Sequence, residues 1–152
     1  SLAGPSAALL DLADLKADIF SPTCYSKKPE WFLSQFQKPI SEAKGILVVV
    51  PEYNGSFPGV MKYFIDMLEF PKSLKGVPCA FVGVAAGHFA ALRSVEQLEM
   101  IFAYRQAHLY GTRLFLAGVH DSVNEDGSLK GDLEERLRSL VAGFSKFSGS
   151  LS

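Results

Sequence analysis

This 152-residue chain has little excess charge, few cysteines and no long apolar run. Its formal net charge is −1, so it lacks the basic surface used to bind nucleic acid or anionic membranes, and neither partner is expected. No run approaches the roughly 18 apolar residues that a membrane span requires. The first residues show no basic segment followed by an apolar core, so no signal peptide is expected. We therefore predict a cytoplasmic protein.

The cysteine and histidine content argues against a metal centre. Cys24 and Cys79 lie far apart and belong to no metal-binding pattern, so we expect two reduced thiols. No group of His, Cys, Asp and Glu has the spacing of metal ligands, and no metal site is predicted.

The composition is that of a globular protein. Apolar residues make up 48% of the chain and charged residues 20%. We predict one domain over residues 1–147, long enough to bury a core, followed by an irregular tail over 148–152.

One central stretch combines a buried strand with a polar loop. Residues 46–50 are five consecutive apolar residues between Gly45 and Pro51, which predicts a strand buried on both faces of a parallel sheet. Asn54-Gly55 is a turn signal, and Pro58 suits the first turn of a helix. The polar loop therefore leaves the carboxyl end of a strand, where open α/β sheets bind ligands.

The remaining pattern alternates strands and helices, which predicts an α/β fold with a parallel sheet. Residues 16–29 show no periodicity and are predicted to be loop. The helix over 58–68 is apolar on more than one side, which favours a subunit interface. The predicted elements are strands at 7–10, 78–84 and 112–117, and helices at 29–43, 58–68, about 90–106 and 129–144, with Pro39 bending or ending the first part of the 29–43 helix.

Pro51-Glu52-Tyr53-Asn54-Gly55-Ser56, followed by Pro58-Gly59-Val60-Met61-Lys62 and Asp66, resembles the signature loop of the NADPH-dependent FMN reductases. That family is flavodoxin-like and includes azo, quinone and chromate reductases. The resemblance implies a three-layer sandwich with strand order 2-1-3-4-5, bound FMN, and NADPH or NADH as the electron donor. It also implies a homodimer or homotetramer, formed through the 58–68 helix and the helix near 90–106.

The resemblance also implies where FMN is held. The family's signature loop lies against the isoalloxazine ring, and a second loop leaves the adjacent strand. The implied cofactor-binding residues are Pro51, Glu52, Tyr53, Asn54, Gly55, Ser56, Ala85, Gly87 and His88. Where this chain has Ala85-Ala86 the family often has Gly-Gly. Each added Cβ leaves less room for the loop backbone to approach the flavin ring.

Several side chains keep two interpretations. His88 contacts flavin or nicotinamide, or is an exposed loop histidine; His108 and His120 are expected to be solvated. Arg93 and Arg105 meet an NADPH phosphate, or lie on solvated helix faces. No catalytic side chain is expected, because a flavin performs its own hydride chemistry.

The family's first strand, its phosphate loop and its first helix have no counterpart in these residues. The absent strand would sit between the 7–10 strand and the 46–50 strand. Three explanations stay open: the residues exist outside this sequence, the protein is truncated, or another chain supplies the strand.

The expected function is an FMN-dependent NAD(P)H oxidoreductase that passes electrons to a flavin, quinone, azo or metal-oxyanion acceptor. The alternative is a non-catalytic interaction or structural protein that keeps the fold but has lost FMN binding. An electron-transfer flavodoxin fits less well, because such carriers usually present a strongly charged docking face.

Overall fold

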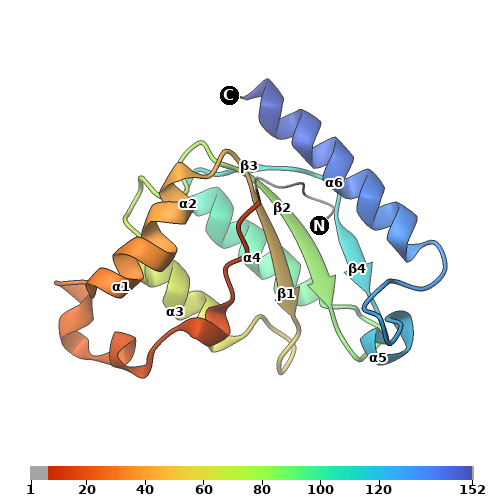
Figure 1. The fold of residues 1–152 in the computed structure, drawn as a ribbon, viewed down its shortest axis with the longest axis horizontal. Coiled ribbons are helices and arrows are strands. Elements are labelled where there is room, and N and C mark those ends of the chain that lie inside the picture. The colour runs from red at the N-terminus through yellow and green to blue at the C-terminus, as the bar shows by residue number, and fades with distance from the viewer. Residues whose placement is uncertain (1–6, 152) are drawn as a thin grey trace.

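A computed structural model describes residues 7–151 of the chain. Its parallel sheet is centred on β2 (Pro78–Val84), which pairs from Cys79 onward with the whole of β1 (Ile46–Pro51) (Figure 1). On its other side β2 pairs with β3 (His108–Leu109) near its beginning and with β4 (Leu114–Leu116) near its end. β1, β2 and β4 thus lie side by side as the 3-4-5 part of the predicted order.

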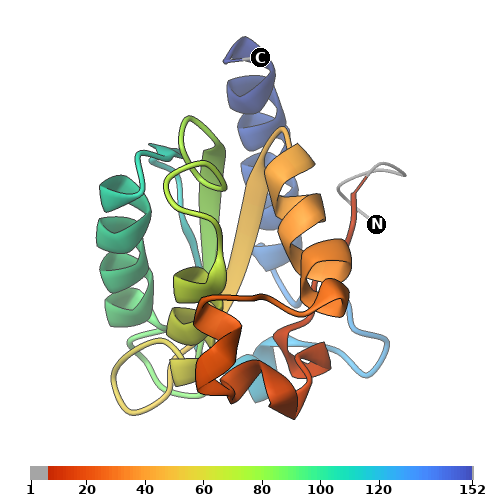
Figure 2. The same cartoon turned by 90° about the vertical axis from the view of Figure 1, so that its left-hand side faces the viewer.

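Helices cover both faces of this sheet. The predicted helices over 58–68 and about 90–106 are α3 (Gly59–Met67) and α4 (Leu92–Tyr104), and the final helix is α6 (Leu133–Ser150). α4 lies on one side of the sheet and α6 on the other (Figure 2). The α/β architecture with a parallel sheet is confirmed.

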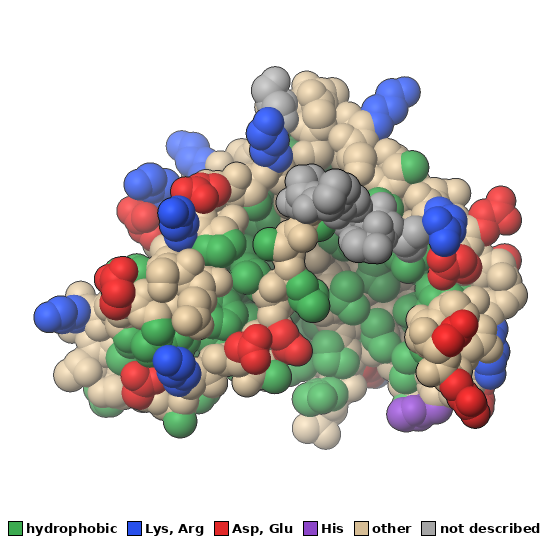
Figure 3. Space-filling view, in the orientation of Figure 1, with side chains coloured by type: hydrophobic (Ala, Val, Ile, Leu, Met, Phe, Trp, Pro, Cys, Tyr) green, Lys and Arg blue, Asp and Glu red, His purple; other side chains and the backbone are tan. Residues whose placement is uncertain are grey.

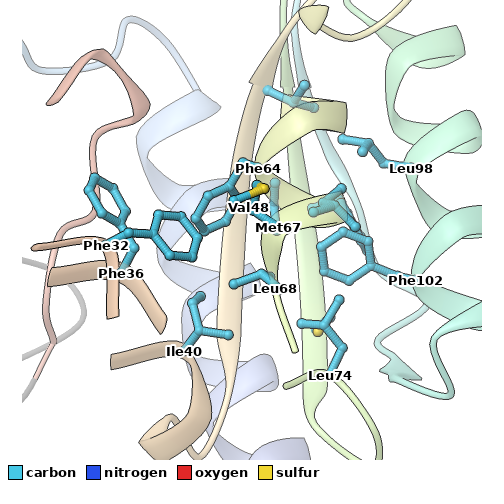
Figure 4. Packing of buried hydrophobic residues seen from close by; sticks show 14 of the residues in the cluster. Phe32, Phe36, Ile40, Val48, Phe64, Met67, Leu68, Leu74, Leu98 and Phe102 are labelled. Carbon is cyan, nitrogen blue, oxygen red and sulfur yellow. The ribbon is translucent and has the colours of Figure 1, made fainter. Parts of the chain in front are cut away.

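The larger part of the core lies on the α4 side of the sheet. Phe32 and Phe36, from the helical segment before β1, pack with Phe64 of α3, and the Phe36 and Phe64 ring centroids are 5.9 Å apart (Figure 4). Burying each such ring contributes roughly 1.5–3 kcal/mol, so this cluster fixes α3 and the strand–loop–helix unit against the sheet. A smaller cluster joins α6 to Val82, Leu114 and other residues on the opposite face.

The prediction that β1 is buried on both faces is wrong. Val48 and Val50 face the larger core, but Val49 on the opposite face is 57% exposed. α6 packs on β2 and β4, so it does not cover the outer part of β1. Figure 3 shows hydrophobic side chains gathered on this face of the molecule.

The predicted strand over residues 7–10 is also wrong. These residues form no regular structure, and among the described residues the second edge of β1 pairs with no strand. A parallel strand forms only where a neighbour accepts and donates its backbone hydrogen bonds.

Other differences concern short or terminal elements. The predicted 29–43 helix is continuous but contains a π-helical turn just before Pro39, which accommodates the missing N–H without ending the helix. The irregular tail predicted from 148 is helical through Ser150, where the Ser148 Oγ donates to the Lys44 carbonyl. The parts of the 29–43 helix are α1 (Glu30–Phe32), η4 (Leu33–Gln37) and α2 (Lys38–Glu42). Prediction missed β3 and several short helices, which are α5 (Val119–Ser122) and the 3₁₀ turns Leu12–Asp14, Ala17–Phe20 and Pro22–Tyr25.

Candidate functional site

The signature loop is a tight turn that continues from β1. The Glu52 N–H donates to the Val84 carbonyl at 3.0 Å, which extends the pairing with β2 by one residue. Tyr53 and Ser56 then exchange backbone hydrogen bonds of 2.7 and 3.1 Å around Asn54 and Gly55. Both central residues have positive φ, 54° and 77°, which Asn tolerates and Gly adopts freely. Their two N–H groups have no acceptor among the described residues.

The loop after β2 turns back sharply before α4. Ala90 and Ala91 both have positive φ, 49° and 65°, a backbone conformation that costs an alanine roughly 1–2 kcal/mol. The corner packs tightly on the strand, because a Cβ built at Gly83 would lie 2.7 Å from the Ala90 carbonyl oxygen. The N–H groups of residues 86–89 have no acceptor in the described part of the chain.

The two loops meet at one pocket of about 180 Å³ at the carboxyl end of β1 and β2. It is lined by Glu52, Asn54, Gly55, Ala85, Ala86, Gly87, Phe89 and Ala90.

The structure therefore brings together Glu52, Asn54, Gly55, Ala85 and Gly87 of the predicted site. Pro51, Tyr53, Ser56 and His88 do not line the pocket. Tyr53 is 61% exposed, and the Ser56 Oγ is bound to the Gln97 Oε1 at 2.5 Å. His88, like His108 and His120, has an exposed side chain.

Prediction missed three pocket-lining residues, Ala86, Phe89 and Ala90. The sequence Phe-Ala-Ala-Leu fits the first turn of an amphipathic helix, so the loop was expected to end at His88. The sequence signal that could have extended the predicted loop beyond His88 is Gly83, whose missing Cβ allows the Ala90–Ala91 corner to approach β2.

The pocket's polar groups fit one edge of a flavin. Its walls offer unpaired backbone N–H donors, which match ring carbonyl and nitrogen acceptors. The Glu52 Oε2 is buried without a hydrogen-bond partner, so it can accept from a ring N–H. A volume of about 180 Å³ is below the roughly 300–1,000 Å³ that encloses a whole ligand, so most of a flavin would remain outside.

Arg93 lies within α4 and Arg105 is the C-terminal cap residue of that helix, and the two have different roles. Arg105 is only 5% exposed, and its guanidinium donates to the carbonyl oxygens of Ile65, Leu68 and Glu69 at 2.9–3.4 Å. Burial lowers the pKa of this guanidinium. The two interpretations of Arg105, phosphate contact or solvated face, are therefore both wrong: it fastens α4 to the C-terminal end of α3. Arg93 is exposed and lies over the Phe89 ring, beside the pocket.

A second and larger hollow lies between α3 and α4, with a volume of about 690 Å³. Its rim carries large exposed apolar side chains: Phe70 is 60% exposed, Met100 67% and Tyr104 74%. Asp66 of α3 also lines this hollow, and its carboxylate is paired there with the Lys62 Nζ at 2.7 Å.

Comparison with known proteins decides the family. Residues 2–121 match the family model described as NADPH-dependent FMN reductase. The chain belongs to this family. The signature-loop resemblance noted in the sequence is thus confirmed, and the chain is a member of a family of oxidoreductases.

Two curated relatives illustrate the match. The chain is 26% identical over 141 residues to an NAD(P)H-dependent FMN reductase of Pseudomonas aeruginosa, covering 90% of this chain and 75% of that protein. It is 32% identical over 104 residues to a 2-hydroxy-1,4-benzoquinone reductase of Burkholderia sp., covering 66% of this chain and 56% of that protein.

Solved structures share the fold. The flavoenzyme NAD(P)H:(acceptor) oxidoreductase FerB of Paracoccus denitrificans superposes with a TM-score of 0.78 at 24% identity, over 94% of this chain and 80% of that one. The apo form of the NADH:FMN oxidoreductase EmoB gives a TM-score of 0.69 at 17% identity, over 94% of this chain and 71% of that one.

Two kinds of feature that would indicate other classes of protein are absent from residues 7–151. No helix there is both long and apolar enough to cross a membrane. That part of the chain holds no cluster of three or more His, Cys, Asp or Glu side chains suited to a metal ion. Cys24 and Cys79 are both free and buried, and burial raises the pKa of the Cys79 thiol to about 12.

Proposed function

We propose that this protein binds FMN at the pocket between the loops after β1 and β2 and acts as an NAD(P)H-dependent reductase. One observation carries the proposal: two loops with unpaired backbone N–H groups converge at the carboxyl ends of neighbouring parallel strands. Membership of the NADPH-dependent FMN reductase family gives the chemical class.

When bound, FMN supplies the redox chemistry, accepting a hydride from NADPH or NADH and passing two electrons to an acceptor. The chain supplies binding and orientation. The N–H groups of Asn54 and Gly55 would donate to the ring, and Gly55, which has no Cβ, would allow the backbone to approach it closely. Such donors stabilise negative charge on the reduced ring, which raises its potential.

The acceptor is a small molecule. A quinone or a free flavin is favoured, because relatives carry the names quinone reductase and FMN reductase. The shallow pocket would leave a flavin open on one side, so azo compounds and metal oxyanions also fit the proposed site. The cytoplasmic location predicted above suits a reductase that uses NAD(P)H.

We further propose that a second copy of the chain covers the hollow between α3 and α4, forming a homodimer or a homotetramer. The apolar rim of Phe70, Met100 and Tyr104 would then be buried, as expected for large exposed apolar patches. Sedimentation of the purified protein would test this.

FMN titration of the purified chain, followed by flavin fluorescence, tests the main proposal. The informative variant is Gly87→Leu: Gly87 lines the pocket, has no atom within 4 Å of its Cβ position and is not in the left-handed region. The leucine is therefore expected to fill the pocket without unfolding the chain, weakening FMN at least about tenfold, the equivalent of 1.4 kcal/mol.

Gly149→Leu is the matched control, because Gly149 also has free space around it and lies on α6, far from the pocket. Its FMN affinity should equal that of the wild type. A folded wild-type chain that binds no FMN would favour the alternative, a non-catalytic interaction protein. Equal FMN binding by both leucine variants would place the cofactor elsewhere.

A further inference from the structure

Arg93 is distinguished from the other arginines by its partners. Among the described residues it has no carboxylate within ion-pair distance, and its guanidinium carbon lies 5.1 Å from the centroid of the Phe89 ring. The others bind acceptors within the protein, carbonyl groups or carboxylates: Arg105, Arg113, Arg136 and Arg138.

The position of this pair beside the pocket is also unusual. Phe89 lines the pocket yet is 65% exposed, a high value for a phenyl ring. The Arg93 Nη1 lies only 3.9 Å from the position that a Cβ on Gly55 would take, so the guanidinium reaches from α4 across to the signature loop. An oriented cation and an exposed ring thus stand together beside the pocket.

The size of the pocket makes this location relevant to a ligand. At about 180 Å³ it accepts the edge of a ring, and the rest of a bound nucleotide would lie outside, over Phe89 and Arg93. Guanidinium presents a planar set of donors that matches phosphate oxygens two at a time. The cation–π contact with Phe89 limits the rotamers of Arg93 without using its N–H groups.

We propose that Arg93, held over Phe89, binds a phosphate group of the nucleotide whose ring enters the pocket. The inference rests on the proposed nucleotide site. The phosphate belongs either to FMN or to the dinucleotide donor, since both carry the chemistry that a free guanidinium recognises. Phe89 is a positioning residue in this arrangement, because it orients the arginine.

Paired ligands test the proposal by direct binding, without turnover. FMN is compared with riboflavin, which lacks the phosphate, and NADP⁺ with NAD⁺, which lacks the 2′-phosphate. Wild type, Arg93→Gln and Arg138→Gln are titrated with each; Arg138 is an exposed arginine on α6, paired with Glu134, and controls for the loss of one positive charge.

The expected result is that Arg93→Gln binds one phosphate-bearing ligand about tenfold more weakly, as for the loss of a charge-assisted hydrogen bond. A loss for FMN but not riboflavin assigns the flavin phosphate. A loss for NADP⁺ alone assigns the 2′-phosphate, and a loss for both dinucleotides assigns the pyrophosphate. Arg138→Gln should match the wild type, and the affected affinity should fall less steeply with salt in Arg93→Gln.

Two further variants separate charge from geometry. Arg93→Lys keeps the charge without the planar fork and should restore part of the affinity. Phe89→Leu should weaken the same ligand by about threefold, because the arginine is less well oriented.

The outcomes also separate this inference from the proposed function. If the wild type binds FMN and Arg93→Gln binds each of the four ligands as tightly as the wild type does, the role of Arg93 is refuted and the function stands. A parallel loss for FMN and riboflavin would show a contact with the ring and refute phosphate binding. A wild type that binds none of the four refutes the function and the inference together.

Discussion

Gly83 is the point where the structure makes its sharpest prediction, because the strand and the loop corner meet there without space for a side chain. A Cβ at this position would lie 2.7 Å from the Ala90 carbonyl oxygen and 2.8 Å from the Phe115 Cδ1. Both distances are shorter than the 3.0 Å below which Cβ contacts are essentially not seen. The Phe115 ring can rotate, but the backbone oxygen moves only if the Ala90–Ala91 corner moves.

Replacing Gly83 by Ala should therefore destabilise the protein and displace the loop that lines the pocket. Overpacking of this kind costs typically 1–3 kcal/mol. A cost of about 2 kcal/mol lowers Tm by about 4–8 °C in a chain of this size. FMN affinity should fall in the same variant, because Ala85, Gly87, Phe89 and Ala90 all belong to that loop.

Thermal unfolding and FMN titration of Gly83→Ala check this, with Gly59→Ala as the control. Gly59 has no atom within 4 Å of its Cβ position and starts α3, so alanine there should be neutral or stabilising by up to about 1 kcal/mol. Because both changes add one methyl group to a glycine, the difference between them isolates the clash. If Gly83→Ala has the Tm and FMN affinity of Gly59→Ala, the argument for a tightly packed corner fails.

Two further predictions concern buried groups outside the pocket. Arg105→Met removes the donors to three carbonyl groups at the end of α3 and should lower the free energy of unfolding, measured in urea, by about 3 kcal/mol. The stability of Arg105→Lys should lie between those of the wild type and the Met variant. A Met variant as stable as the wild type would mean that the buried cation has no net effect on stability. Cys79 should resist iodoacetamide at pH 8 in the native protein and react in urea, as read by peptide mass, because burial raises its pKa from 9.0 to about 12. Rapid labelling of Cys79 in the native protein would contradict this protection. Because the thiol stays neutral in the folded state, its contribution to stability is complete below about pH 9 and is lost as the pH rises toward 12.

The local features of the fold could be predicted from the sequence. Apolar runs bounded by Gly and Pro located β1 and β2 correctly, and Asn54-Gly55 gave the turn between β1 and α3. These features depend on neighbouring residues, because a turn and a strand end are set by backbone conformations that a few side chains decide. The same residues carried the resemblance that the family match confirms.

Features that depend on distant partners could not be predicted in this way. Residues 7–10 look like a strand by composition, but a strand needs an adjacent edge to pair with, which sequence pattern does not reveal. Arg105 was expected either to meet an NADPH phosphate or to lie on a solvated helix face, because nothing near it in the sequence indicates that the carbonyl groups of residues 65, 68 and 69 lie within reach.

The candidate site divides in the same way. The sequence by itself determined which loops carry it, because each loop follows a recognisable buried strand. Only the tertiary structure decided that Ala90 and Ala91 turn back in the left-handed region, that Phe89 lines the pocket, and that Arg93 reaches toward Gly55. The physical reason is that packing against Gly83 holds alanines in a conformation that their own preferences disfavour.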